Sequence, residues 1–224
     1  MNRFLISAII ALTVLASCKK TSSVKSDPEK VKFSNVLILG NSITYSPANP
    51  TVGWACNCGM AASMPDSDYV HLLTRNFKES NSNSTVAVKN IAAFELEFTT
   101  YDFDAELKAL RDAKPDLIVI RIGENVQKDK FDAATFEKRY AALLTYLKTG
   151  NENVQILAVG SFWGNGPVDA IMLKHSAFIA LQPLGLNMSN YAWGLFADHG
   201  VQSHPDDKGM RNISNAIWAK VKTM

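Results

Sequence analysis

Residues 34–42 read SNVLILGNS, a short apolar run that closes at Gly40 and is followed by two polar residues. A run of this length and composition is typical of a strand that is buried on both faces of a parallel sheet. Four similar short runs predict further strands, at 85–91, 116–122, 154–159 and 184–188.

Helical patterns separate most of these runs. The clearest has Asp132 as its N-cap, Gly150 beyond its end and apolar residues at helical spacing between them. Other helices are predicted near 66–78, 104–112, 168–180 and 207–222. Strands that alternate with helices predict one α/β domain, in which helices cover both faces of a mainly parallel five-stranded sheet.

Composition and charge exclude several classes of protein. The 224 residues are 47% hydrophobic and 20% charged, which is typical of a packed globular domain and excludes a wholly disordered chain. Lys and Arg total 23 and Asp and Glu total 21, so the formal charge of +2 gives no electrostatic footprint for binding nucleic acid. Three cysteines are too few for a disulfide scaffold.

The first residues carry a targeting pattern. Residues 1–17 combine a basic start with a thirteen-residue apolar run and small residues before Cys18, as a secretory signal peptide does. The tetrad LASC at 15–18 resembles the lipobox of bacterial lipoproteins, which implies lipidation of Cys18. We therefore expect a lipid anchor on the membrane, a polar tether through residue 33, a domain at 34–224, and a periplasmic or surface-exposed location in the bacterial cell envelope.

Polar residues stand where three predicted strands end. GNSIT at 40–44 follows the first strand, NIAAFE at 90–95 the second, and GEN at 123–125 the third, while HPDDKGM occupies 204–210. In an open parallel sheet, ligands bind outside the carboxyl ends of the strands. A serine, an asparagine and a histidine at one rim could supply the nucleophile, the oxyanion donor and the base of acyl transfer.

The ordered set GNS, GEN and HPDDKG resembles the SGNH (GDSL-like) hydrolases over residues 34–224. The resemblance implies a flavodoxin-like three-layer α/β/α fold and a serine esterase. By position, Ser42 matches the nucleophile and one backbone oxyanion donor, Asn125 the asparagine that supplies a second donor, and His204 the general base. His199 lies nearby as the alternative base.

The sequence departs from the family pattern at three positions. Asn41 stands where the family has an aspartate before the serine, and Glu95 where it has a glycine whose backbone amide is the third oxyanion donor. Val201 stands where an aspartate would orient the histidine. Either Asp198 or a backbone carbonyl near Val201 could orient His204 instead.

Several other residues stand out. Arg121 interrupts an apolar strand, so it pairs with Glu95 or Glu124, or else its side chain reaches solvent. Cys56 and Cys58 could form a disulfide or remain thiols, and they lack the further ligands of a zinc site. Three tryptophans in predicted loops could bind sugar rings or cover the core: Trp54, Trp163 and Trp193.

Together these features predict an esterase that removes small acyl groups, such as acetyl, from a carbohydrate. No motif for a nucleotide, a catalytic metal or another cofactor is present, so the expected reaction requires none. Two alternatives remain open. One is a lipase or thioesterase of the same family, and the other is a glycan-binding lipoprotein whose catalytic machinery has been lost.

Overall fold

A computed structural model describes residues 31–224. Its sheet contains five parallel strands within that range, in the order β2-β1-β3-β4-β5. These are β1 (Asn35–Gly40), β2 (Thr85–Asn90), β3 (Leu117–Arg121), β4 (Gln155–Val159) and β5 (Ala177–Ile179). This order is that of the flavodoxin-like folds, so the predicted fold class is confirmed.

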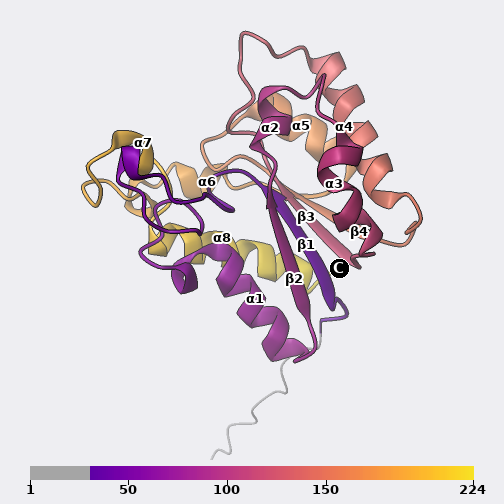
Figure 1. The fold of residues 1–224 in the computed structure, drawn as a ribbon, viewed down its shortest axis with the longest axis horizontal. Coiled ribbons are helices and arrows are strands. Elements are labelled where there is room, and N and C mark those ends of the chain that lie inside the picture. The colour runs from indigo at the N-terminus through magenta and orange to yellow at the C-terminus, as the bar shows by residue number, and fades with distance from the viewer. Residues whose placement is uncertain (1–30) are drawn as a thin grey trace, which may run out of the picture.

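Helices cover both faces of the sheet (Figure 1). Val36 and Ile38 of β1 point to one face and Leu37 and Leu39 to the other, because successive side chains of a strand alternate. The first face packs against α1 (Tyr69–Ser80) and α8 (Asp207–Val221). The second face is covered by α2 (Ala92–Leu96), α3 (Phe103–Asp112), α4 (Ala133–Lys148) and α5 (Gly166–His175).

The predicted cap of α4 is present, and α8 begins with a cap of the same kind. The Asp132 side chain accepts a hydrogen bond from the Thr135 amide at 2.8 Å and begins α4. Asp206 does the same for α8 through the Gly209 amide, also at 2.8 Å. A capped start fixes the first turn of a helix, and for α8 the cap residue lies two residues after His204.

The last strand does not lie at the predicted position, 184–188. Residues 184–188 form no strand, because α6 (Gln182–Gly185) ends there and a short 3-10 helix (Met188–Asn190) begins. The fifth strand is β5, which lies inside the range predicted as the end of a helix. Its three residues are only exposed or half-buried, so this edge strand carries no fully buried apolar run that could reveal it.

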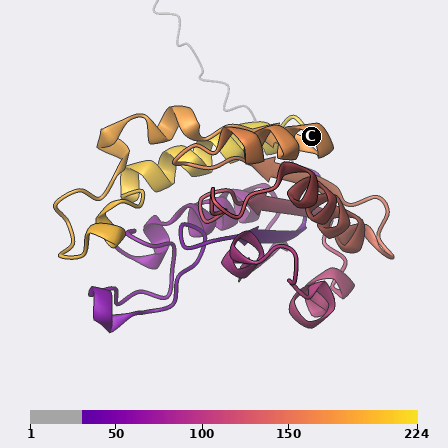
Figure 2. The same cartoon turned by 90° about the horizontal axis from the view of Figure 1, so that it is seen from above.

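Two long segments extend to the same side of the molecule. One follows β1 and contains a 3-10 helix (Pro50–Val52), and the other precedes α8 and contains α7 (His199–Gln202) (Figure 1 and Figure 2). The rings of Trp54 and Phe196 join these segments, with centroids 5.9 Å apart. Residues from distant parts of the chain therefore meet beside the sheet.

The fold includes residues 31–33, which the sequence predicts as the end of the tether. Phe33 is a buried member of the core, and the Val31 amide donates to Ser80 Oγ at 2.8 Å. The predicted signal peptide, the lipidation of Cys18 and the tether up to residue 30 lie outside the described residues and stay predictions. Among residues 31–224, no helix combines the length and the apolar character needed to cross a membrane.

Candidate active site

The site lies where three neighbouring strands end at the same height. Gly40, the last residue of β1, pairs with Asn90 of β2 and with Arg121 of β3. A Cβ at position 40 would stand 1.9 Å from Thr44 Oγ1, so the close return of the chain at this turn requires glycine. The segments that follow these strands therefore leave the sheet side by side.

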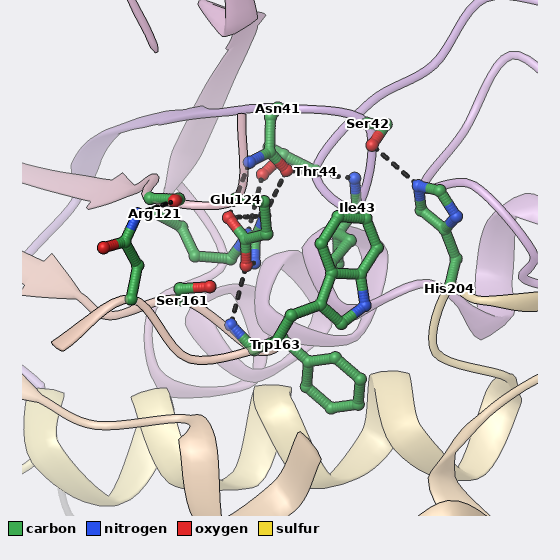
Figure 3. Close-up of polar contacts among 12 residues, drawn as sticks. Asn41, Ser42, Ile43, Thr44, Arg121, Glu124, Ser161, Trp163 and His204 are labelled. Atoms are coloured by element: carbon green, nitrogen blue, oxygen red, sulfur yellow. Dashed lines mark hydrogen bonds and ion pairs between the residues drawn. The ribbon is translucent and has the colours of Figure 1, made fainter. Parts of the chain in front are cut away.

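Ser42 and His204 meet at this edge (Figure 3). Ser42 Oγ lies 2.8 Å from His204 Nε2, and His204 Nδ1 lies 2.7 Å from the carbonyl oxygen of Gly200. A carbonyl oxygen can only accept, so Nδ1 carries the proton of the neutral ring. Nε2 is then left with a lone pair that accepts the Ser42 hydroxyl proton, which is the arrangement of a serine nucleophile and its base.

The surroundings hold His204 in place and keep it neutral. The Ala192 amide donates to the His204 carbonyl at 3.0 Å, and the indole of Trp163 stands edge-on to the imidazole with centroids 5.3 Å apart. Only 6% of His204 is exposed. Burial lowers the pKa of its imidazole below the ordinary 6.5.

The orienting group of His204 is a carbonyl rather than a carboxylate. Asp198 instead caps α7, where its side chain accepts from the Val201 amide at 2.9 Å, so the structure does not bring it to the imidazole. Val201, at the position of the family acid, is buried in the core. His199 is exposed, and no hydrogen bond joins it to Ser42 in the described part of the chain. The site is therefore a Ser-His pair.

Two of the N–H groups expected to act as oxyanion donors keep a hydrogen without an acceptor among the described residues. Within residues 31–224 the Ser42 amide has no hydrogen-bond acceptor. Asn125 Nδ2 gives one of its two hydrogens to Glu95 Oε2 at 2.8 Å and keeps the other. The Glu95 amide, the expected third donor, belongs to α2, where the Ile91 carbonyl accepts from the Phe94 amide at 2.8 Å; its role as a donor stays a prediction. The Glu95 side chain also enters the site.

A buried ion pair lies beneath the nucleophile. Arg121 is fully buried, which rules out the alternative in which its side chain reaches solvent. Its Nη1 contacts Glu124 Oε1 at 2.8 Å and its Nη2 contacts Asn41 Oδ1. Figure 3 shows Ser42 between this group and His204. The pairing predicted for Arg121 is thus with Glu124, while Glu95 joins the group through Asn41.

The Glu95 carboxylate is the acceptor that links the ends of all three strands. It accepts from Asn41 Nδ2 at 3.0 Å, from the Gly123 amide at 2.6 Å and from the Asn125 side chain. Gly123 has φ +130°, a conformation that favours glycine. Burial and the neighbouring Glu124 raise the pKa of Glu95. Burial would raise the pKa of Glu124 too, but Arg121 together with hydrogen bonds from the Phe162 amide and Asn41 lowers it.

The three tryptophans differ in their environments. Trp54 is buried, and its indole N–H donates to the Ser46 carbonyl at 3.3 Å, so it packs in the core and is no exposed sugar platform. Trp163 is 40% exposed beside His204. Trp193 is 42% exposed and stacks on Tyr191 with centroids 5.5 Å apart. Open aromatic faces therefore remain at positions 163 and 193.

A cavity lies between the two long segments. Its volume is about 950 Å³, and its walls include Trp54, Met64, Phe196 and Asp207. Cys56, which also lines it, is joined to Cys58 by a disulfide bond, which settles the alternative left open by the sequence. Neither Ser42 nor His204 lines this cavity, although Asp206, two residues after His204, does.

Comparison with known proteins supports the fold. No protein-family model and no curated protein matches the sequence. Among solved structures, the chain is similar to a salicylyl-acyltransferase from a tetracycline biosynthetic pathway, with a TM-score of 0.58 and 13% identity over 85% of this chain and 55% of that one. It is also similar to a candidate GDSL-like lipase from Bacteroides uniformis, with a TM-score of 0.55 and 16% identity over 86% and 97% of the two chains.

A third similar structure is a family two carbohydrate esterase from Clostridium thermocellum in complex with cellohexaose. The TM-score is 0.54 and the identity 14%, over 85% of this chain and 64% of that one. The chain thus spans just over half of the acyltransferase and slightly less than two thirds of this esterase. At these identities the likeness shows a shared fold.

Proposed function

We propose that this protein is a serine esterase of the SGNH type that hydrolyses small acyl esters through an acyl-enzyme. The observation that carries the proposal is the contact of 2.8 Å between Ser42 Oγ and His204 Nε2, together with the Gly200 carbonyl at Nδ1. This geometry aims an unprotonated base at a serine hydroxyl, which is what nucleophilic catalysis by serine requires.

The reaction follows from these groups. Ser42 Oγ attacks the ester carbonyl while its proton passes to His204 Nε2, and the Ser42 amide and Asn125 Nδ2 donate to the oxyanion. The C–O bond to the alcohol breaks, and His204 gives the proton to the departing oxygen. Water then attacks the acyl-Ser42 ester, again losing its proton to His204, and the carboxylic acid leaves as Ser42 regains its hydrogen.

The departures from the family pattern do not leave the site incomplete. The Asn41 side chain makes polar contacts with Arg121, Glu95 and Glu124. The acid missing at Val201 is replaced as orienting group by the Gly200 carbonyl. These contacts favour catalysis over the alternative in which the fold only binds glycans, because a site kept for binding alone has no need of a correctly protonated base.

We extend the proposal to acetyl or similar small acyl groups carried by a carbohydrate. Trp163 presents an open aromatic face beside His204, and the exposed Trp193 follows Ala192, whose amide donates to the His204 carbonyl. Aromatic rings supply large, rigid contact areas for apolar faces of a ligand. The similar carbohydrate esterase, whose structure contains a sugar oligomer, supports the same substrate class.

Trp193 provides the test of this substrate class. For Trp193→Ala we expect kcat/KM on an acetylated oligosaccharide to fall about tenfold relative to kcat/KM on p-nitrophenyl acetate, because a tryptophan in a binding site commonly contributes more than about 1 kcal/mol. Trp193→Phe keeps an aromatic face and should retain most of the ratio. Acetate release and p-nitrophenol release measure the two rates. An unchanged ratio in Trp193→Ala would contradict carbohydrate binding at this face.

The burial of His204 predicts the acid limb of the pH profile. Because burial lowers the pKa of the imidazole, the ring stays neutral and able to accept a proton down to a pH below the ordinary 6.5. We expect kcat/KM for p-nitrophenyl acetate to rise with pH and to reach half its plateau below pH 6.5. A midpoint well above this value would show that another group controls the reaction.

A further inference from the structure

We propose that Glu95 is a positioning residue that orients the two asparagines beside the nucleophile, Asn41 and Asn125. The inference rests on the proposed esterase activity, because it assigns to Glu95 the task of aligning the groups that perform it. The side chain comes from α2, after the second strand, and is fully buried. It places a side-chain acceptor at a position where the family has a glycine without one.

The contacts of the carboxylate fit its ionised form. Oε1 lies 2.6 Å from the Gly123 amide nitrogen and 3.2 Å from that of Asn125, and Oε2 lies 2.8 Å from Asn125 Nδ2 and 3.0 Å from Asn41 Nδ2. Every one of these groups is an N–H donor. A proton on either oxygen would face donors and find no acceptor among them, so the donor set stabilises the anion although burial and Glu124 oppose it.

For Asn125 the consequence is a fixed orientation of the side-chain amide. Glu95 can only accept, so Nδ2 must face it, and the reversed amide would set Oδ1 against a carboxylate. Asn125 Nδ2 lies 2.8 Å from Glu95 Oε2 and donates one hydrogen to it, which leaves the second for an oxyanion. Glu95 therefore ensures that the crevice meets an N–H rather than a carbonyl oxygen.

For Asn41 the consequence is a fixed turn next to Ser42. Its Nδ2 lies between Glu95 and Glu124, and its Oδ1 contacts Arg121 Nη2 and accepts from the Ile43 amide at 3.3 Å. An aspartate at position 41 would face two carboxylates without a hydrogen to give. The asparagine before the serine and the glutamate at position 95 are thus complementary, so that the carboxylate of this site stands at position 95 instead of position 41.

The first test is Glu95→Gln, which keeps the shape but places an amide NH₂ among the donors. We expect kcat for p-nitrophenyl acetate to fall about 100-fold, the scale of losing one oxyanion donor, with KM changed less than about threefold, since the substrate does not touch Glu95. Glu97→Gln is the matched control: it makes the same chemical change at an exposed position two residues away and should leave both constants unchanged.

The second test exchanges the acid and the amide. Asn41→Asp alone should reduce kcat strongly, because three carboxylates then meet, whereas Asn41→Asp combined with Glu95→Gln restores a donor facing an acceptor. We expect kcat of the double variant to exceed that of Asn41→Asp by at least about tenfold, a coupling expected of residues in one hydrogen-bond network. This comparison decides the matter if Glu95→Gln alone folds poorly.

The outcomes separate the two proposals. The role of Glu95 would be overturned if Glu95→Gln had the kcat of the wild type. It would also be overturned if the loss of kcat in the double variant equalled the product of the losses in Asn41→Asp and Glu95→Gln. Either result would leave the esterase proposal intact. A wild-type protein that releases no p-nitrophenol would instead refute the esterase, and the role of Glu95 with it. A loss confined to the thermal midpoint, with kcat of the folded protein unchanged, would reduce Glu95 to a structural residue and reject the inference.

Discussion

Ser42→Ala, His204→Ala and the variant that carries both changes should lose kcat by the same factor, on the order of 10⁶. Ser42 Oγ and His204 Nε2 share one proton across 2.8 Å, so removing either group disables the other and the second removal costs nothing more. What survives in all three variants is the contribution of the oxyanion donors and of substrate binding.

Release of p-nitrophenol from p-nitrophenyl acetate measures the three losses, and circular dichroism verifies that each variant folds. His199→Ala is the control, because His199 is an exposed histidine five residues before His204 and was the alternative base in the sequence. It should retain wild-type kcat. A Ser42→Ala variant with undiminished turnover, or losses that add in the double variant, would mean that the two side chains do not act together.

Most of the fold could be predicted because its strands are buried. Val36 to Leu39 and Leu117 to Ile120 are shielded on both faces, so the apolar runs that mark them have no polar interruption. The same physics explains the missed strand. β5 pairs with β4 along three residues only and none of them is fully buried, so packing against β4 and α8, rather than local sequence, determines its place.

The site was predictable to the extent that it uses side chains in the family order. Ser42 and His204 were identified from short motifs and meet in the structure. A backbone carbonyl near Val201 was one of the two orienting groups that the sequence offered, and the structure has that of Gly200. The sequence alone could not choose it over Asp198, because every residue has a carbonyl and only tertiary structure aims one at an imidazole. Glu95 was expected to act through its backbone. A carboxylate at a position where the family has glycine, with Arg121 in a buried strand, was the signal that its side chain matters.

Substitution of Arg121 is expected to have the largest effect on the free energy of unfolding. We expect Arg121→Met to lower the free energy of unfolding at pH 7 by about 3–5 kcal/mol, the cost of leaving a buried charge without its partner. The substitution removes the guanidinium that lies 2.8 Å from Glu124 Oε1, while Glu95 and Glu124 remain buried close to each other. Urea denaturation of the wild type and the variant measures the difference.

Arg121→Met combined with Glu124→Gln tests whether the loss is electrostatic. The glutamine keeps an acceptor for the Phe162 amide, which Glu124 Oε1 now binds at 2.6 Å, but removes the unpaired charge. The double variant should therefore be more stable than Arg121→Met alone by at least about 1 kcal/mol. If both variants are equally unstable, the loss comes from packing around the arginine and not from the charge that it neutralises.

The pH dependence of the free energy of unfolding of Arg121→Met tests the electrostatic explanation independently. In the wild type the pKa of Glu124 is below its ordinary 4.5, because Arg121 and the hydrogen bonds from the Phe162 amide and Asn41 together outweigh burial. Its ionisation therefore stabilises the fold above pH 4.5, and this contribution is lost as the pH falls through the lowered pKa. Without Arg121 the main group that opposes burial is gone and the pKa of Glu124 rises, so its ionisation destabilises the fold at neutral pH and protonation removes the unpaired charge. The gap in stability between wild type and Arg121→Met should consequently narrow from pH 7 to pH 5. A gap that stays constant or widens would show that the carboxylates do not depend on Arg121 for their charge.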